Sequence, residues 1–211
     1  MKLNYGIKKI NNIIPLSYIF VLYFIYINIE GVRALNKVKV DHTDKLAYYK
    51  LACFLKDYIN EKSIIVCIGT DKCIGDCLGP LVGTYLKNAN FCLPVYGTTE
   101  NPIHALNLRN KLDLINKLHS DANIIGVDAC LGEDDSIGEI QVRNYPIHPG
   151  NGVGKSLPSV GTMSLVGIVD SNASSEIFSS RSIRLDLIIK MANVIKKSII
   201  HSYYLYMEEN F

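Results

Sequence analysis

Two aspartates occupy positions where their side chains could perform hydrolytic chemistry. Asp76 lies between glycine and cysteine in residues 63–83, SIIVCIGTDKCIGDCLGPLVG, after one apolar run and before the next. Asp128 directly follows the apolar run 124–127, IIGV. A carboxylate beside a buried strand must be hydrogen-bonded, paired or used in function, because burial of an isolated charge costs much free energy. Both residues are therefore candidates for a functional site.

Such a pair suits acid–base catalysis if the two side chains meet. Two carboxyl groups in close approach do not both ionise easily, so the pKa of one rises. The result is an acid beside a base, which can activate a water molecule against an amide bond. The spacing leaves a structural alternative open, in which Asp76 caps the following helix and Asp128 accepts backbone N–H bonds from a turn.

The pattern of apolar residues predicts the elements that would bring the two acids together. Residues 63–69 form a short β-branched run, which is typical of a strand buried on both faces. Further strands are expected in 93–98, 123–132, 138–144 (nearer an edge) and 162–170, and helices in 41–60, 78–89, 102–119 and 182–204. This alternation predicts an α/β fold, a three-layer α/β/α sandwich with a mostly parallel sheet. Asp76 after the first strand and Asp128 at the end of the third would then share the carboxyl edge, where ligands bind in such sheets.

Length and charge narrow the class of protein. The chain has 211 residues, enough for one domain with a substantial core. Its 22 basic and 20 acidic residues give a net charge of +2, so no nucleic-acid partner is expected.

The cysteines indicate a reduced protein without a metal centre. Cys67 and Cys130 lie in apolar runs and are interpreted as small core residues. Cys73 and Cys77 have no second pair to complete a zinc site. Reduced thiols in a cytosolic compartment are expected, with no cofactor and no metal.

An apolar segment precedes the expected domain. Residues 13–29 form a nearly unbroken apolar run of 17 residues, close to the lower limit for a membrane-spanning helix. The segment could be a membrane anchor, a signal peptide cleaved after Ala34, or an extension that belongs to no fold. We divide the chain into residues 1–38, with possible membrane association through 13–29, and an α/β domain over 39–211.

A glycine-rich loop resembles a nucleotide-binding motif only superficially. In residues 145–161, YPIHPGNGVGKSLPSVG, the first glycine that a Walker loop needs is replaced by Pro149. In addition, Pro158 stands where the following helix should form. We therefore expect no ATP or GTP binding.

Five segments, in order, resemble the YyaC family of sporulation proteins: IIVCIGTDKCIGDCLGPLVG, VYGTTENPIHALNL, GVDACLG, IHPGNGVGKSLPSVG and GIVD. The resemblance runs from about Lys39 to Ala192. It implies a fold similar to that of the spore germination protease and, more distantly, of the hydrogenase maturation proteases, which are phosphorylase/hydrolase-like.

The resemblance also implies roles for the two acids. GDCLGP and VDACLG place Asp76 and Asp128 on the two proposed catalytic aspartates of the germination protease, an unusual aspartic peptidase that acts on small acid-soluble spore proteins. In the hydrogenase maturation proteases the same positions hold nickel-binding acids, with a histidine as third ligand. The corresponding segment here, LPSVGTMSL, contains no histidine, and neither His104 nor His148 matches the motif. A metal-free carboxylate pair is therefore expected.

The expected function is a sporulation-associated endopeptidase in the spore or forespore cytoplasm, with a protein or peptide substrate. The expected substrate-binding residues are Thr70 in the loop after the first strand, His104 at the start of a helix, and Lys155 in a flap over the carboxyl edge. Two alternatives remain open: a non-catalytic sporulation factor that binds a peptide or partner in the same crevice, and a metal-dependent maturation-type peptidase.

Overall fold

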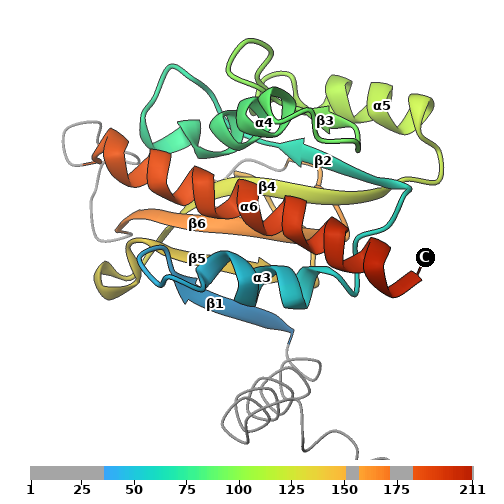
Figure 1. Ribbon diagram of the computed structural model, residues 1–211. Coiled ribbons are helices and arrows are strands. Elements are labelled where there is room, and N and C mark those ends of the chain that lie inside the picture. Colours follow the sequence, from blue (N-terminus) through green and yellow to red (C-terminus); the bar gives the residue numbers. More distant parts are fainter. Residues whose placement is uncertain (1–35, 151–156, 172–182, 211) are drawn as a thin grey trace, which may run out of the picture. The chain divides into compact units, whose positions relative to one another are not determined.

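A computed structural model describes residues 36–150, 157–171 and 183–210 (Figure 1). Over these residues six strands form one sheet, in the order β1-β5-β6-β4-β2-β3. The strands are β1 (Lys37–Asp41), β2 (Ser63–Cys67), β3 (Val95–Tyr96), β4 (Asn123–Gly132), β5 (Glu139–Arg143) and β6 (Met163–Ser171). The helices are α3 (Ala47–Leu55), α4 (Leu78–Asn88), α5 (Leu108–Leu118) and α6 (Leu185–Asn210), with 3-10 turns η1 (Gly75–Cys77) and η2 (Asp134–Ser136).

The sheet is mostly parallel, as the sequence predicts. Strands β3, β2, β4 and β6 run parallel to one another, whereas β5 is antiparallel to β6 and β1 is antiparallel to β5. In this register Cys67 at the end of β2 pairs with Val127 of β4, and Asp128 pairs with Val166 of β6. The loop that carries Asp76 therefore leaves β2 beside the point where Asp128 lies in β4.

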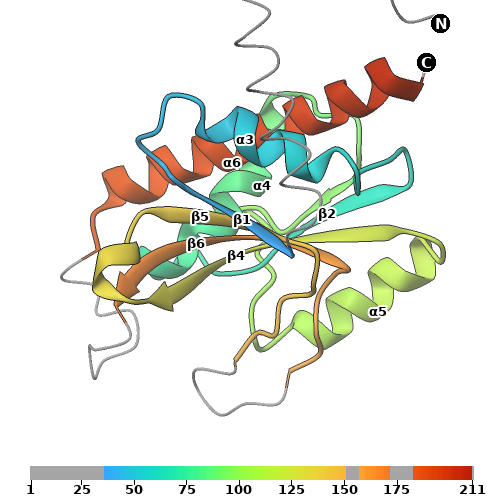
Figure 2. The same ribbon diagram turned by 90° about the horizontal axis from the view of Figure 1, so that it is seen from below.

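Helices cover both faces of the sheet, which confirms the three-layer arrangement. Helices α3, α4 and α6 lie over one face, and α5 lies over the other (Figure 2). Helices α3 and α6 pack against each other, and each has fully buried apolar side chains, including Leu51 and Ile195. Gly79 allows α4 to begin close to the sheet, because a Cβ there would lie 2.1 Å from the carbonyl oxygen of Ile68.

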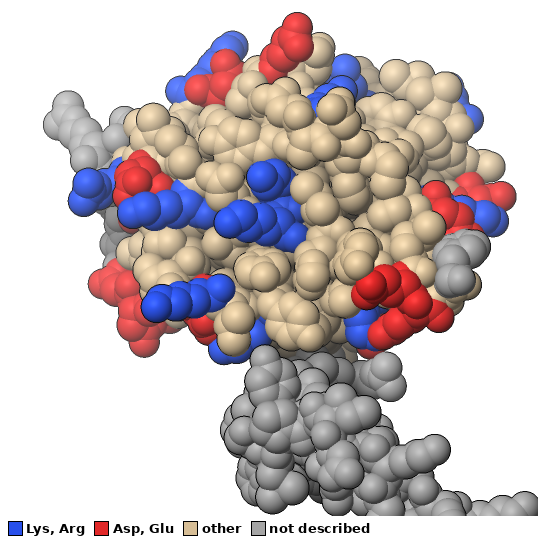
Figure 3. Space-filling model, in the orientation of Figure 1, with Lys and Arg blue, Asp and Glu red and all other residues tan. Residues whose placement is uncertain are grey.

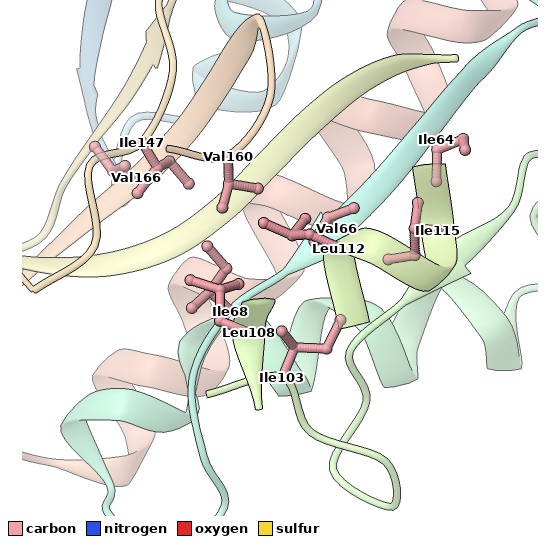
Figure 4. Packing of buried hydrophobic residues seen from close by; sticks show 10 residues of the cluster. All are labelled: Ile64, Val66, Ile68, Ile103, Leu108, Leu112, Ile115, Ile147, Val160 and Val166. Carbon is pink, nitrogen blue, oxygen red and sulfur yellow. The ribbon is translucent and has the colours of Figure 1, made fainter. Parts of the chain in front are cut away.

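The α5 face is held by a continuous apolar cluster (Figure 4). Leu108, Leu112 and Ile115 recur at helical spacing and are buried, whereas Leu114 on the same helix is 50% exposed. This amphipathic pattern explains why α5 packs on the sheet through one face. The cluster consists of Ile64, Val66, Ile68, Ile103, Leu108, Leu112, Ile115, Ile147, Val160 and Val166.

Strand β1 was not expected from the sequence. The segment KVKVD is short, and it pairs with β5, which is distant in the sequence. Lys37 lies opposite Arg143, and Asp41 lies opposite Glu139. The compact unit that contains the sheet begins at Asn36, slightly before the expected boundary at residue 38. The helix expected in 41–60 is correspondingly shorter, because Asp41 ends β1 and a turn precedes Ala47.

The apolar run 13–29 lies outside the described residues. Within residues 36–210, in the parts that are described, no helix is both long and apolar enough to cross a membrane. On the face that carries α6, a short row of basic side chains lies near the middle, and most acidic side chains lie toward the edges (Figure 3).

Candidate active site

Asp76 and Asp128 line the same cavity, of about 660 Å³. The cavity lies on the α5 side of the sheet, where its wall includes Val166, the partner of Asp128 across β4 and β6 and a member of the α5-face cluster. Ile68, the first residue after β2, forms another part of the wall. The parallel register of β2 and β4 thus brings the two acids together, as the sequence predicts.

A tight turn positions Asp76. Its backbone carbonyl accepts a hydrogen bond from the Thr70 N–H at 3.1 Å, and its own N–H donates to the Cys73 carbonyl at 3.2 Å. Gly69 adopts φ +135°, and a Cβ there would lie 2.0 Å from the Asp76 carbonyl oxygen, so only glycine permits this approach. The loop after β2 therefore folds back on itself and holds Asp76 at the cavity wall.

Asp76 does not act as a helix cap. It lies in η1, and the N-cap of α4 is Cys77, whose side chain makes no capping hydrogen bond. The capping alternative left open by the sequence is therefore not what the structure shows for Asp76.

Strand β4 spans the predicted residues 123–132, but Asp128 lies inside the strand and not at its end, where the sequence analysis had placed it. The strand continues to Gly132 because β6 pairs with it beyond Asp128, across a register shift between Cys130 and Leu131. The Asp128 Oδ1 accepts a hydrogen bond from the N–H of Ala129 at 2.8 Å. Irregular pairing of this kind is frequent beside active sites, where it changes the direction of side chains.

The surroundings shift the pKa values of the two acids by different amounts. Burial raises the pKa of Asp76 to about 6, and a backbone hydrogen bond from Thr70 works in the opposite direction. Burial raises the pKa of Asp128 well above its usual range, and the negative charge of Asp76 raises it further. Both side chains retain some solvent contact through the cavity. Asp76 accordingly ionises before Asp128 as the pH rises.

Three further side chains in the cavity were not identified from the sequence as site residues. Cys130, Arg143 and Tyr145 all line it. Cys130 was expected in the core, but it is only partly buried, because its side chain faces the cavity that Asp128 also faces. The alternation in GEIQVRN placed Arg143 on one face of a strand, but only the pairing of β5 with β6 shows which cavity that face borders.

Of the three expected substrate-binding residues, one lines the cavity, one does not, and one lies outside the described residues. His104 lines the cavity, but it precedes α5, which begins at Leu108 with Asn107 as N-cap. The His104 N–H donates to the Asn107 Oδ1 at 2.9 Å, which holds this segment as a turn. Thr70 is outside the cavity wall and supports the Asp76 turn through its backbone instead. Lys155 lies outside the described residues.

The described residues contain no arrangement of three His, Cys, Asp or Glu side chains that could hold a metal ion. His148 and His104 both line the cavity with the two acids without forming such a group. Of the other cysteines, Cys67 is fully buried, as expected, and burial raises its pKa.

Fold and site together define a class: a three-layer α/β protein with a pair of carboxyl groups in a cavity beside neighbouring parallel strands. Residues 39–198 match the profile of a family described as "Protein of unknown function (DUF1256)", and the chain belongs to this family. A curated relative, "Uncharacterized protein YyaC" of Bacillus subtilis (strain 168), is 40% identical over 168 residues, which cover 77% of this chain and 82% of the relative. The resemblance to the YyaC family is thereby confirmed.

Proposed function

We propose that the protein is an endopeptidase that acts on a spore or sporulation protein, with Asp76 and Asp128 as its catalytic acids. The observation that supports this proposal is that the two carboxyl groups share one cavity while their pKa values differ. Pairs of titratable groups whose surroundings separate their pKa values commonly serve as acid and base.

The difference in pKa supports a different role for each residue. Near pH 7, Asp76 is mostly ionised because its pKa is about 6, so it is the general base. Asp128 holds its proton more strongly than Asp76, because the charge of Asp76 opposes its ionisation, so it is the general acid. The assignment follows from the deeper burial of Asp128, which disfavours its charged form more strongly.

Hydrolysis then proceeds in two steps. Asp76 takes a proton from a water molecule, the water oxygen attacks the peptide carbonyl carbon, and Asp128 gives its proton to the carbonyl oxygen. In the second step the C–N bond breaks, the proton held by Asp76 passes to the leaving amine, and Asp128 recovers a proton from the tetrahedral intermediate. Both acids return to their starting states, and the net reaction consumes one water molecule.

The cavity suits a peptide segment. Its volume of about 660 Å³ falls within the range of small-ligand sites. Apolar side chains such as Ile147 and Leu157 line it together with the two acids. Resemblance to the germination protease suggests small acid-soluble spore proteins as substrates and the cytoplasm of the spore or forespore as the location. Membrane association through residues 13–29 belongs to the same proposal.

Proteolysis of such spore proteins by the purified full-length chain tests the proposal, with new peptide termini identified by mass spectrometry. Asp76→Asn and Asp128→Asn should each reduce the cleavage rate by at least about 100-fold, the usual contribution of a general acid or base. Asp71→Asn is the matched control, because Asp71 lies in the same loop, is exposed and does not line the cavity. Cleavage that survives both Asn substitutions, or a wild type that cleaves nothing, would refute the mechanism.

The pH profile gives a second test of the role assignment. The rate should rise as the pH passes the Asp76 pKa of about 6, because the base must be ionised. It should fall at higher pH, where Asp128 loses its proton. A rate that decreases steadily from pH 5 upwards would contradict the assignment.

Non-catalytic binding of a peptide or partner is the alternative that the same cavity supports, because its apolar and charged walls could bind without chemistry. This alternative would be favoured if a spore protein binds stably without being cleaved, and if neither Asn substitution removes that binding.

A further inference from the structure

We propose that Arg143 binds a carboxylate of the peptide that enters this cavity, and thereby selects peptides that carry one near the segment presented to Asp76 and Asp128. The inference rests on the proposed function only for the statement that the ligand is a peptide. It adds the chemical group that the ligand must carry. The carboxylate could belong to an acidic side chain or to the C-terminus, and the experiment below separates these sources.

The positive charge of Arg143 is not neutralised within the described part of the chain. Glu139, two residues earlier on β5, pairs instead with Lys39 of β1 at 3.1 Å. Gln141 lies between them, donates through its Nε2 to Glu139, and presents its neutral amide oxygen to Arg143. Among the described residues, Arg143 has no ion pair with a carboxylate. Its charge therefore remains available to a ligand.

The guanidinium is held in a defined orientation. Its Nε and Nη2 both donate to the Gln141 Oε1, at 3.0 and 2.7 Å, and its central carbon lies 5.6 Å from the centre of the Tyr145 ring. A guanidinium has five N–H donors, so this arrangement leaves donors free. A planar, oriented guanidinium with free donors matches the two oxygens of a carboxylate.

Arg143 is not the counter-ion of the catalytic acids. Burial and the charge of Asp76 raise the pKa of Asp128, and Arg143 is not among the groups that shift it. Arg143 instead acts on Cys130: its charge and hydrogen bond partly offset the burial that raises the pKa of that thiol to about 11. The cavity therefore has an acid pair and a separate cation, a distribution that can recognise an anionic group beside the bond to be cleaved.

Peptide binding to the full-length Asp76→Asn protein tests the inference without turnover. The probe is a fluorescein-labelled, amidated octapeptide library in which each position in turn is Glu or Gln, with a second Gln set that has a free C-terminus. Fluorescence polarisation should show at least about tenfold tighter binding when a carboxylate is present at one preferred position, the scale of a charge-assisted hydrogen bond at a partly exposed site. The Glu peptides report side-chain recognition and the free C-terminus reports terminal recognition.

Arg143→Gln should abolish this preference, so that Glu and Gln peptides bind alike, and Arg143→Lys should retain part of it. Arg109→Gln is the matched control, because Arg109 is an exposed cation on α5 outside the cavity. A urea unfolding curve checks that each variant is folded. If Arg143→Gln does not fold, the test is the affinity of Arg143→Lys for Glu and Gln peptides, where the preference for Glu should be smaller than with Arg143.

Equal binding of carboxylate and amide peptides, a preference that survives Arg143→Gln, or no binding of any library member would overturn the inference. Failure of the proposed function has a different signature. Carboxylate selectivity without cleavage by the wild type would retain the role of Arg143 and refute the endopeptidase. Cleavage by the wild type without carboxylate selectivity would retain the endopeptidase and refute the role of Arg143.

Discussion

Replacement of Asp76 by asparagine should stabilise the protein at neutral pH while it removes the proposed catalytic base. The buried carboxyl group has a pKa of about 6 in the folded chain, compared with 3.8 for the unperturbed group. Burial therefore penalises the ionised form in the folded state. Asparagine keeps a similar shape without a charge, so it removes the penalty.

The size of the effect follows from the pKa difference. At about 1.4 kcal/mol per pKa unit, a rise from 3.8 to about 6 corresponds to about 3 kcal/mol when Asp76 is ionised in both states. Solvent contact through the cavity lowers this value, and we expect about 2 kcal/mol. Stabilisation by loss of a catalytic charge is common, because active sites hold groups that folding alone would disfavour.

The pH dependence has a definite sign. Below about pH 3.8 Asp76 is protonated in both states and contributes no difference. As the pH rises from 3.8 to about 6, the unfolded chain releases its proton while the folded chain retains it, so this group lowers the stability of the wild type. Above that range the full penalty remains.

Urea denaturation of the wild type and of Asp76→Asn at pH 4, 5, 6, 7 and 8 measures the effect. The difference in unfolding free energy should be less than about 0.5 kcal/mol at pH 4 and reach about 2 kcal/mol in favour of the variant at pH 7 and above. Asp71→Asn, at an exposed position in the same loop, should change stability by less than about 0.5 kcal/mol throughout. A constant difference across the series, or an Asp76→Asn protein that is less stable at pH 8, would refute the reasoning.

Three further predictions concern the same fold. In the asparagine variant above, the pKa of Asp128 should fall because the charge that raises it is gone, and carbon-13 NMR titration of the carboxyl group would detect this; an unchanged value would mean that the two acids do not interact. Leu112→Ala should destabilise the protein by about 3 kcal/mol in thermal or urea unfolding, because Leu112 is only 6% exposed in the α5 cluster. Leu114→Ala, on the exposed face of the same helix, should cost less than about 1 kcal/mol. Similar losses in the two variants would show that α5 does not pack as described. Glu209→Gln should cost about 1 kcal/mol in urea unfolding at pH 7, since it removes the nearer of two charged partners of the largely buried Lys56, at 2.5 Å, and leaves Asp57 at 3.3 Å. No loss at low salt would show that the contact with Glu209 is not stabilising.

The sequence predicted the layers of the fold because periodicity is a local property. The β-branched run of β2 and the helical spacing in α5 and α6 depend on neighbouring residues, and all three elements form in the predicted regions, although α5 begins only at Leu108 and α6 extends to Asn210. Strand β1 was missed because five residues of alternating charge and valine carry little local signal. What makes it a strand is its pairing with β5, about one hundred residues later.

The residues of the candidate site also fall into two groups: those identified from the sequence and those that only the structure showed. Asp76 and Asp128 were identified from the sequence because a carboxylate beside an apolar run is unusual, and because parallel strands end at a common edge. Cys130 and Arg143 carry no such signal: one resembled a core residue and the other the polar side of an ordinary strand. They become cavity residues only through the register of β4, β6 and β5.

The sequence by itself determined the alternation of elements, the family and the two acids, since each rests on residue types and spacings within short segments. Tertiary structure decided the environment of those acids: which carboxyl group is more deeply buried, and which cation shares their cavity without neutralising them. The physical reason is that burial and electrostatic potential are properties of the packed volume around a group. That volume is built from segments distant in the chain, so no single stretch of sequence contains it.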